Sequence, residues 1–421
     1  MRLVRRFAVD VTPLRDNIAF RWLFIGQTVS VAGTQVTQVA IPLQIYQLTH
    51  SSLDVGLVGL AALVPLLVFG LWGGAVADAV DRRKLIVITS AGSGAVSTVL
   101  VLQAMADLRQ VWLLYVCVAV QSAFAALDSP TRRAMLPQLV PGEQVAAANN
   151  LYFAVFNFGV IVGPLLAGVL IGAFGFGAAY GFDVVSFSIA FLAVIFRLPS
   201  LPVAADAAKA GLASVLEGLA FLRGRHVILM TFALDIVAMV FGMPRALFPA
   251  LATHQFHGGI ETAGYLYAAP AVGALLASLT GGWMSRVHKQ GAAVVWAILA
   301  WGAAITCFGF SSSLLLGLFF LAVAGAGDTV SAVFRSTILQ TAVPDALQGR
   351  LSGIFTVVVG GGPRLGDLEA GAAASVAGNA FSVISGGIIC IALTLVLSAA
   401  VPAFAKYDSR AAKESEPVPV G

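Results

Sequence analysis

The sequence predicts an all-α membrane protein with twelve transmembrane helices in two pseudo-symmetric six-helix halves. Three observations support this prediction: the chain is mostly apolar, its positive charges fall on alternate loops, and its halves resemble each other. Of 421 residues, 59% are apolar and 10% are charged, whereas soluble globular proteins carry about 25% charged residues. So few charged side chains cannot cover a soluble fold of this size, and we therefore expect a lipid bilayer around the chain.

Twelve segments are long and apolar enough to cross the hydrocarbon core of a bilayer, which takes about 20 helical residues. They lie near residues 19–45, 52–80, 84–106, 110–138, 145–173, 177–197, 227–253, 261–286, 291–311, 313–341, 348–374 and 378–404. The basic N-terminal stretch lacks the apolar core and cleavage site of a signal peptide, so the first segment is expected to remain a span.

The positive charges orient these spans. With the N-terminus in the cytoplasm, nearly all of the 24 Lys and Arg residues fall on the cytoplasmic side, Arg132 and Arg335 among them. Arg109 falls outside, and Arg245 and Arg364 lie within spans. The positive-inside rule then predicts that both termini lie in the cytoplasm. We expect the chain to lie in the cytoplasmic membrane of a bacterium.

The two halves of the chain repeat one another in parallel. VGLVGLAALVPLLVFGLWGGAVAD at 55–78 resembles AGYLYAAPAVGALLASLTGGWMSR at 263–286, and RRAMLPQLVP at 132–141 resembles RSTILQTAVP at 335–344. Repeats of this kind are common in transporters. The predicted parts are an N-terminal half (1–197), a cytoplasmic linker with an amphipathic helix (198–226), a C-terminal half (227–405) and a cytoplasmic tail (406–421).

The loop after the second span carries a motif. It reads GGAVADAVDRRK at 73–84, a glycine and an aspartate followed by a basic cluster. With the span count, the repeat and the linker, this loop resembles the major facilitator superfamily, although Ala79 and Asp81 replace the usual arginine and glycine. The resemblance implies a cytoplasmic latch, in which Asp78 meets the start of span 11 and the arginines pair with a carboxylate on span 4. The latch residues are Gly74, Asp78, Arg82, Arg83, Asp128 and Arg132.

Span 5 carries a second motif, GVIVGPLLAG at 159–168. It resembles the antiporter motif of superfamily drug exporters at four positions, with Ala167 replacing a further glycine; the matching residues are Gly159, Gly163, Pro164 and Gly168. Two interpretations stay open. The small residues can let helices pack closely, or the motif can favour export over import, as the resemblance implies.

Within the superfamily, the chain most resembles the enterobactin-exporter branch. The likeness is carried by IPLQI (41–45), LFPALA (247–252), GYLYAAPAVGA (264–274) and ILQTAVPDALQGRLSG (338–353). It implies proton-coupled export of a siderophore or a similar amphiphilic small molecule by alternating access. Because this branch grades into Tap-type multidrug pumps, a broad-specificity efflux pump is the alternative. A non-transporting membrane scaffold or lipid scramblase is an alternative of another class.

Polar residues inside the spans are the candidates for substrate contact. Gln27, Gln35 and Gln38 fall near one face of span 1. The fold implied by the resemblance has a central cavity, which we expect these glutamines to line together with Asn157 of span 5 and Arg245 of span 7. Hydrogen bonding between helices is the alternative use of such side chains.

Carboxylates inside the spans are the candidate proton carriers. A charge at the membrane centre costs from about 2.5 to more than 10 kcal/mol, so such groups persist when they are paired, hydrated or needed. We expect Asp235 and Asp328 to carry protons, with Asp367 and Glu369 on span 11 as further candidates. The alternative is a structural Arg–Asp pair between helices.

The stretch GGGPRLGDLEAG at 360–371 is unusually polar for the span it lies in. We expect a kinked helix there, because proline removes a backbone donor. Arg364 and Asp367 stand three residues apart, which allows an internal ion pair, and we expect Glu369 to point toward Arg245. The stretch serves either as an outer gate or as a structural network.

Several function classes find no support in the sequence. His254 and His257 lack the companion ligands of a metal site, and the chain has neither a Walker sequence with its lysine nor a basic nucleic-acid patch. No nucleophile–base pair indicates an enzyme. We therefore expect no cofactor and no metal, and a monomer whose partners are a small-molecule substrate, protons and the lipid bilayer.

Overall fold

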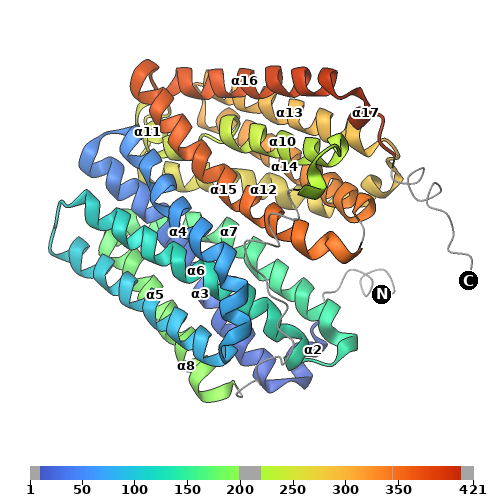
Figure 1. Cartoon of the computed structure of the whole chain (residues 1–421). Coiled ribbons are helices and arrows are strands. Elements are labelled where there is room, and N and C mark those ends of the chain that lie inside the picture. Colours follow the sequence, from blue (N-terminus) through green and yellow to red (C-terminus); the bar gives the residue numbers. More distant parts are fainter. Residues whose placement is uncertain (1–9, 199–219, 344, 409–421) are drawn as a thin grey trace, which may run out of the picture. The chain divides into compact units, whose positions relative to one another are not determined.

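A computed structural model describes residues 10–198, 220–343 and 345–408, except for the side chains at 71–79, 345–350, 352–354 and 356. The described residues form helices joined by short turns and loops, and their one β-bridge joins Lys289 to Asp408 (Figure 1). By its internal contacts the chain divides into two compact units. The first unit comprises 1–44 and 64–210, and the second comprises 45–63 and 211–421.

Helices occupy all twelve predicted segments. Ten helical segments in the described residues are long and apolar enough to span a membrane. The helices of segments 1 and 11, α3 (Ile18–Thr49) and α15 (Asp345–Ala377), are longer still at 32 and 33 residues. They fall outside that set of ten because glutamines and threonines in α3, and charged residues in α15, make them more polar. The predicted amphipathic linker helix centres on 212–219, which lies outside the described residues.

The first unit is built from six long helices. They are most of α3, the later part of α4 (Ser52–Ala79), α5 (Arg82–Met105), α6 (Val111–Leu139), α7 (Val145–Phe174) and α8 (Phe176–Arg197), with the short α2 (Thr12–Asp16) and η1 (Gly142–Gln144). The side chain of Asp81 caps α5 by accepting from the backbone N–H of Arg83 at 2.9 Å. In Figure 1, α5 lies beside α6 and α8.

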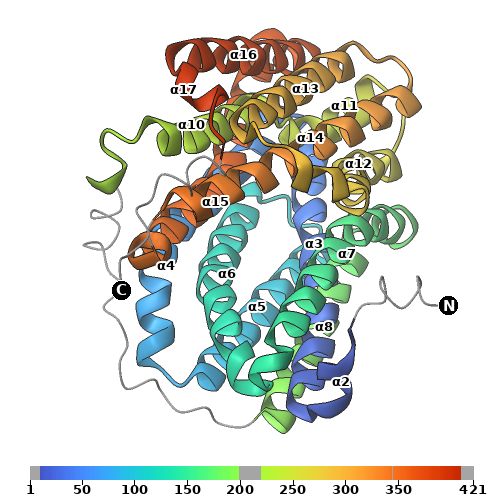
Figure 2. The same ribbon diagram turned by 90° about the vertical axis from the view of Figure 1, so that its right-hand side faces the viewer.

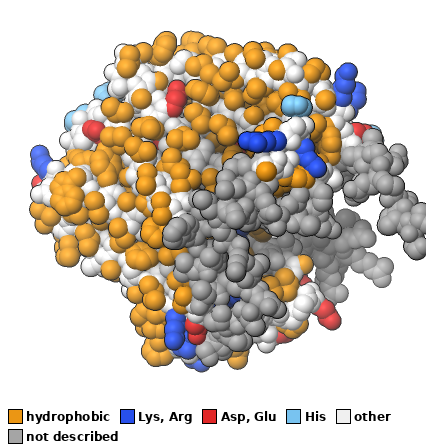
Figure 3. Space-filling view, viewed as in Figure 1, with side chains coloured by type: hydrophobic (Ala, Val, Ile, Leu, Met, Phe, Trp, Pro, Cys, Tyr) orange, Lys and Arg blue, Asp and Glu red, His pale blue; other side chains and the backbone are white. Residues whose placement is uncertain are grey.

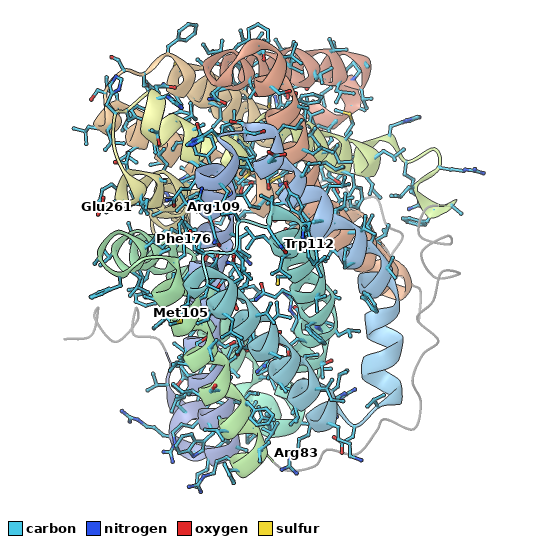
Figure 4. The ribbon with its side chains drawn as sticks, turned by 90° about the vertical axis from the view of Figure 1, so that its left-hand side faces the viewer. Arg83, Met105, Arg109, Trp112, Phe176 and Glu261 are labelled. Carbon is cyan, nitrogen blue, oxygen red and sulfur yellow. The ribbon has the colours of Figure 1, made fainter. Side chains whose placement is uncertain are left out.

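The ends of these helices differ in character. In Figure 4, Arg83 lies at one end of the bundle, and Met105, Arg109, Trp112 and Phe176 lie toward the other. Trp112 is 60% exposed, and exposed tryptophans are typical of the interface between membrane and water. We therefore expect the part of the bundle between Arg83 at one end and Trp112 at the other to lie in the bilayer.

The second unit contains the remaining helices. They are α10 (His226–Phe241), η2 (Arg245–Leu247), α11 (Phe248–His254), α12 (Ile260–Leu279), η3 (Gly281–Arg286), α13 (Gln290–Phe310), α14 (Leu314–Ala342), α15, α16 (Asn379–Ala400) and α17 (Pro402–Ala405). The C-terminal end of α3 and the N-terminal end of α4 also belong to it. Figure 3 shows hydrophobic side chains over most of the described part of one face. On α16, Phe381, Ile388 and Val396 are exposed. Apolar surface this extensive fits lipid contact.

The predicted seventh span is not one continuous helix. Helix α10 ends at Phe241, and the chain runs through Gly242 and Pro244 into η2 and then α11. Pro244 has no backbone N–H to continue the helical ladder. The indole N–H of Trp301 donates to the Gly242 carbonyl at 2.8 Å, and the Tyr267 hydroxyl donates to the Arg245 carbonyl at 3.1 Å. Side chains of α12 and α13 thus satisfy a break that lipid could not satisfy.

Glycines let α12 and α14 approach closely. A Cβ atom built on Gly273 would overlap the carbonyl oxygen of Ala322, and one on Gly325 would overlap that of Pro270. Each helix therefore presents a glycine where the backbone of the other passes. Close approach of backbones through small residues is a common source of stability between helices in lipid.

We predict that Gly273→Ala lowers the thermal unfolding temperature of the protein in detergent, because the added methyl forces α12 and α14 apart. The matched control is Gly181→Ala in α8, where an added Cβ meets nothing within 4 Å. There alanine should be neutral or stabilising, since it favours a helix over glycine by about 1 kcal/mol. Equal unfolding temperatures for the two variants would contradict the packing argument.

Candidate functional site

A buried cluster of charges joins α10 and α14. The guanidinium of Arg335 forms an ion pair with the Asp235 carboxylate, and its Nη2 lies 3.9 Å from Oδ1 of Asp328. Arg335 and Asp235 are almost fully buried, whereas the Asp328 side chain is 33% exposed. The cluster thus holds one cation between two carboxylates: Asp235 is enclosed, and the Asp328 side chain is partly exposed although its Oδ1 is buried.

The arrangement is a consequence of helix geometry. Asp328 and Arg335 stand seven residues apart on α14, which places them on one face two turns apart. Asp235 approaches that face from α10, which packs against α14. The Arg335 side chain is buried, and a carboxylate from another helix compensates its charge. The structural Arg–Asp pair raised as an alternative therefore exists, and its arginine is Arg335.

The first unit has a related cluster on α5 and α6. Arg132 donates to Oδ2 of Asp128 on its own helix at 2.5 Å and to the Ser90 hydroxyl at 3.2 Å. The Thr89 hydroxyl donates to Oδ1 of Asp128 at 2.8 Å. Arg132, like its repeat counterpart Arg335, is 2% exposed, but its carboxylate partner comes from one turn away instead of from another helix.

The basic pair of the predicted latch has other partners. Arg82 donates to the carbonyl of Ala134 at 3.2 Å, and Arg83 donates to the carbonyl of Ile195 at 2.6 Å. Among the described residues, Asp128 pairs with Arg132 one helical turn away and not with Arg82 or Arg83 as predicted. Gly74 and Asp78 lie in α4 in the stretch whose side chains are outside the described residues.

The motif on span 5 forms a helix contact. A Cβ atom on Gly163 would overlap the Cβ of Gln35, and one on Gly159 would lie 2.6 Å from Cγ1 of Val31. Pro164 and Gly168 are also buried in α7. The motif thus allows α7 to lie directly against α3, which agrees with the packing interpretation and leaves a bias toward export untested.

The polar residues predicted for substrate contact belong to different units. Gln27 and Gln35 are partly buried and Gln38 is exposed on α3; the buried Oε1 of Gln27 has no hydrogen-bond partner in the described structure. Asn157 is exposed on α7 and donates to the Phe153 carbonyl of its own helix at 2.9 Å. Arg245 is partly buried in the second unit, at the break in span 7.

Asp367 on α15 lies near this break. The backbone of Ala246 and the cations Arg245 and Arg364 are close to its carboxylate. The guanidinium of Arg245 lies 5.8 Å from the ring centroid of Tyr267. The irregular backbone, two arginines and one carboxylate therefore meet at one place, and in transporters the breaks in discontinuous helices lie at binding sites.

The neighbouring charges on α15 differ from the prediction. The helix runs unbroken past Pro363, and the Arg364 guanidinium donates to the Gly360 carbonyl one turn back. The predicted Arg364–Asp367 ion pair does not form in the described structure, because helical side chains lean toward the N-terminus and carry the long arginine that way. Glu369 is partly buried and forms no ion pair with Arg245 or any other described cation.

The N-terminal part of α4 packs against the same segment of α15 (Figure 2). A Cβ atom on Gly59 would overlap the Arg364 carbonyl, and one on Gly56 would lie 2.5 Å from the Asp367 carbonyl. The hydroxyl of Ser52 donates to Asn379 at 2.7 Å. Residues 52–59 therefore hold the polar stretch of α15 in place through contact between backbones.

Two buried polar networks in the first unit were not anticipated from the sequence. Asp183 on α8 accepts hydrogen bonds from the hydroxyls of Thr37 and Ser97 at 2.9 and 2.7 Å. Gln44 and Gln103 pair through their amides, and the Tyr180 hydroxyl donates to Gln44 at 2.7 Å. A single aspartate in the otherwise apolar run FDVVSFSIA was the available signal for the first network.

No metal site is evident in the described residues. No three His, Cys, Asp or Glu side chains there lie close enough together to hold an ion. His254 instead lies 2.9 Å from the hydroxyl of Tyr46, which belongs to the same unit. Of the two histidines considered as metal ligands, His254 and His257, the first therefore already has a hydrogen-bond partner within the protein.

Comparison with known proteins agrees with this architecture. The family model for transmembrane secretion effectors matches residues 8–420. The enterobactin exporter EntS of Citrobacter koseri is 29% identical over 395 residues, which cover 92% of this chain and 94% of that protein. The likeness thus runs through both units and the segment between them.

Solved transporter structures share the fold. A bacterial homologue of the human lysosomal transporter Spinster, in an inward-facing conformation, has a TM-score of 0.71 at 15% identity and covers 97% of this chain and 100% of that one. The peptide transporter POT has a TM-score of 0.75 at 11% identity, over 92% and 95% of the two chains. At such identities the likeness concerns the fold alone, which is the major facilitator fold.

We predict that Arg335→Gln destabilises the protein strongly, by about 3–5 kcal/mol, because it leaves a buried carboxylate without its cation. Adding Asp235→Asn should recover part of that loss, which a double-mutant cycle of unfolding free energies measures. The control is Arg109→Gln, which removes an exposed pair with Asp107 and should cost little. Additive single effects would show that Arg335 and Asp235 do not interact.

Proposed function

We propose that this chain, which belongs to the family of transmembrane secretion effectors, exports a siderophore or similar amphiphilic small molecule by proton-coupled alternating access. It is a multi-pass protein of a bacterial inner membrane, and we propose that both termini face the cytoplasm. The observation that carries the proposal is the buried cluster of Asp235, Asp328 and Arg335, because a membrane scaffold does not need one cation between two carboxylates inside its helices.

The cluster suggests how a proton is carried. Arg335 compensates one carboxylate, and Asp235 is the one in direct contact with it and sealed from solvent. Asp328 lies farther from the guanidinium and keeps a third of its side chain exposed. We therefore assign the proton to Asp328, which can bind it when the site is wet and lose it when the site opens elsewhere, while Asp235 holds Arg335. Asp367 and Glu369 are proposed as further acceptors along α15.

The second element of the proposal is the substrate site. Arg245 lies where the backbone of span 7 is irregular, and such breaks face ligands in transporters. An arginine offers planar, multiple N–H donors that suit carboxylate or catecholate oxygens. We propose that Arg245 contacts an anionic group of the substrate, with Gln27, Gln35, Gln38 and Asn157 supplying hydrogen bonds from the first half. The named activity of the relative, enterobactin export, supports this substrate class.

The latch is a third proposed element. The resemblance assigns Gly74, Asp78, Arg82 and Arg83 to the contact that holds one of the two alternating states. Asp128 and Arg132, the other two residues of the predicted latch, form an ion pair in the first unit. We propose that these residues control the rate of interconversion and do not touch the substrate.

We predict that deleting the gene reduces the siderophore in the culture medium under iron limitation, measured by mass spectrometry against the wild-type strain. Expression of the intact chain should restore secretion. Unchanged siderophore secretion together with altered drug susceptibility would instead indicate the broad-specificity efflux pump. No change in either would indicate the non-transporting scaffold or scramblase.

We predict that Asp328→Asn, reconstituted in liposomes, abolishes the stimulation of transport by a pH gradient while substrate counterflow persists, since exchange needs no net proton movement. Asp235→Asn should lower protein stability but leave a response to the gradient. Asp107→Asn, in an exposed outer loop, is the control and should behave as the wild type. A wild-type pH response in Asp328→Asn would remove this residue as the carrier.

A further inference from the structure

A second buried carboxyl group lies in the first unit, away from every cation discussed above. Asp183 on α8 is 0% exposed. Its Oδ2 accepts from the hydroxyl of Thr37 on α3 at 2.9 Å and from that of Ser97 on α5 at 2.7 Å, and its Oδ1 lies 3.3 Å from the Ser186 hydroxyl. Three helices thus converge on one carboxyl group through hydroxyls alone.

The surroundings of Asp183 contain no compensating charge. From α3, Gly33 faces it so closely that a Cβ atom there would lie 2.5 Å from Oδ1. From α6 comes Gln121, whose amide donates to Ser97 Oγ at 3.2 Å. The titratable groups nearby are Tyr180, one turn earlier on α8, and Cys117 on α6. No described Lys, Arg or His forms an ion pair with Asp183, in contrast to Asp128 and Asp235.

Counting hydrogens indicates the state of this carboxyl. Each hydroxyl has one hydrogen. Ser97 Oγ lies 3.1 Å from the Ser93 carbonyl, and Ser186 Oγ lies 2.7 Å from the Asp183 carbonyl, so both hydrogens have a competing backbone acceptor. If Asp183 is ionised, the only hydrogen bond it must receive is the one from the Thr37 hydroxyl, although a carboxylate has about four acceptor sites.

A neutral carboxylic acid resolves this shortage. Its own O–H can donate to Ser97 Oγ across the 2.7 Å contact, a usual distance for O–H···O. Ser97 is then free to donate to the Ser93 carbonyl, and Thr37 still donates to the carboxyl. The neutral form also avoids an uncompensated charge on a side chain that is fully buried, which costs several kcal/mol or more.

We propose that Asp183 is a proton-binding site of the first half: it holds a neutral carboxylic acid between α3, α5 and α8 and exchanges that proton during the transport cycle. The exchange rests on the proposed proton-coupled export, whereas the neutral state in the resting protein does not. Release requires water to reach Asp183, and α3 is the helix whose movement would admit it. It carries the buried Thr37 beside the exposed Gln38. The transporter then has one proton site in each half, Asp183 and Asp328.

The protonation state can be read by infrared difference spectroscopy on the full-length protein labelled with ¹³C-aspartate. The wild type at neutral pH should show the C=O stretch of neutral carboxylic acids, and Asp183→Asn should remove one component of it, whereas Asp328→Asn should leave that component in place. Ser97→Ala should keep the band and shift its frequency, because one hydrogen-bond partner is lost while the fold is retained. Absence of the band in the wild type, or an unchanged band in Asp183→Asn, would overturn the proposal.

The exchange is tested in the same liposomes as Asp328→Asn. Asp183→Asn keeps the shape of the side chain but cannot exchange a proton, so gradient-driven transport should fall to the level seen without a gradient while counterflow persists. If Asp183→Asn folds poorly, Ser97→Ala is used in its place. The pH dependence of transport by Ser97→Ala should then differ from that of the wild type.

Wild-type pH dependence in these variants, with the infrared band present, would make Asp183 a structural acid and overturn its part in transport. If the wild type itself shows no proton coupling, the proposed function fails and the exchange with it. The infrared band would still decide the protonation of Asp183, so the two failures are distinguishable.

Discussion

Hydrocarbon offers no hydrogen-bond partners, so each polar group within these helices must find its partner inside the protein. This constraint accounts for most of the specific contacts in the structure. The break in span 7 persists because Trp301 and Tyr267 donate to the carbonyl groups that it frees. Helix α15 lies directly against α10 beside the break, since a Cβ atom on Gly366 would overlap the Met239 carbonyl oxygen.

The two repeats answer this constraint in different ways. Arg132 and Arg335 occupy corresponding positions and are equally buried. Arg132 finds its carboxylate one turn away on the same helix, which makes a contact that any movement of α6 as a rigid body preserves. Arg335 finds its carboxylate on another helix, so relative movement of α10 and α14 alters that pair. The Arg335–Asp235 pair of the second half is thus better suited to couple charge to conformational change. In the first half, the buried carboxyl group of Asp183 is bound by hydroxyls.

Much of the architecture was predictable, because hydropathy, loop charge and repetition are local properties of a chain. These properties predicted the helical segments and the resemblance to the superfamily. The polar residues within the apolar segments also identified Asp235, Asp328 and Arg245 as candidates. The break in span 7 could have been suspected from Gly242 and Pro244, yet proline also occurs inside unbroken helices here, as at Pro363. Local sequence does not distinguish these cases, since the difference lies in whether neighbouring helices supply partners.

By itself, the sequence determined that this is a membrane-spanning chain with charged residues placed where lipid would exclude them. Only the tertiary structure decided which charges meet: Arg335 with Asp235, Arg132 with Asp128, and Asp183 with hydroxyls and no cation. The physical reason is that an ion pair depends on distances of a few ångströms between helices that lie far apart in sequence. Residue spacing fixes such distances within one helix and not between two.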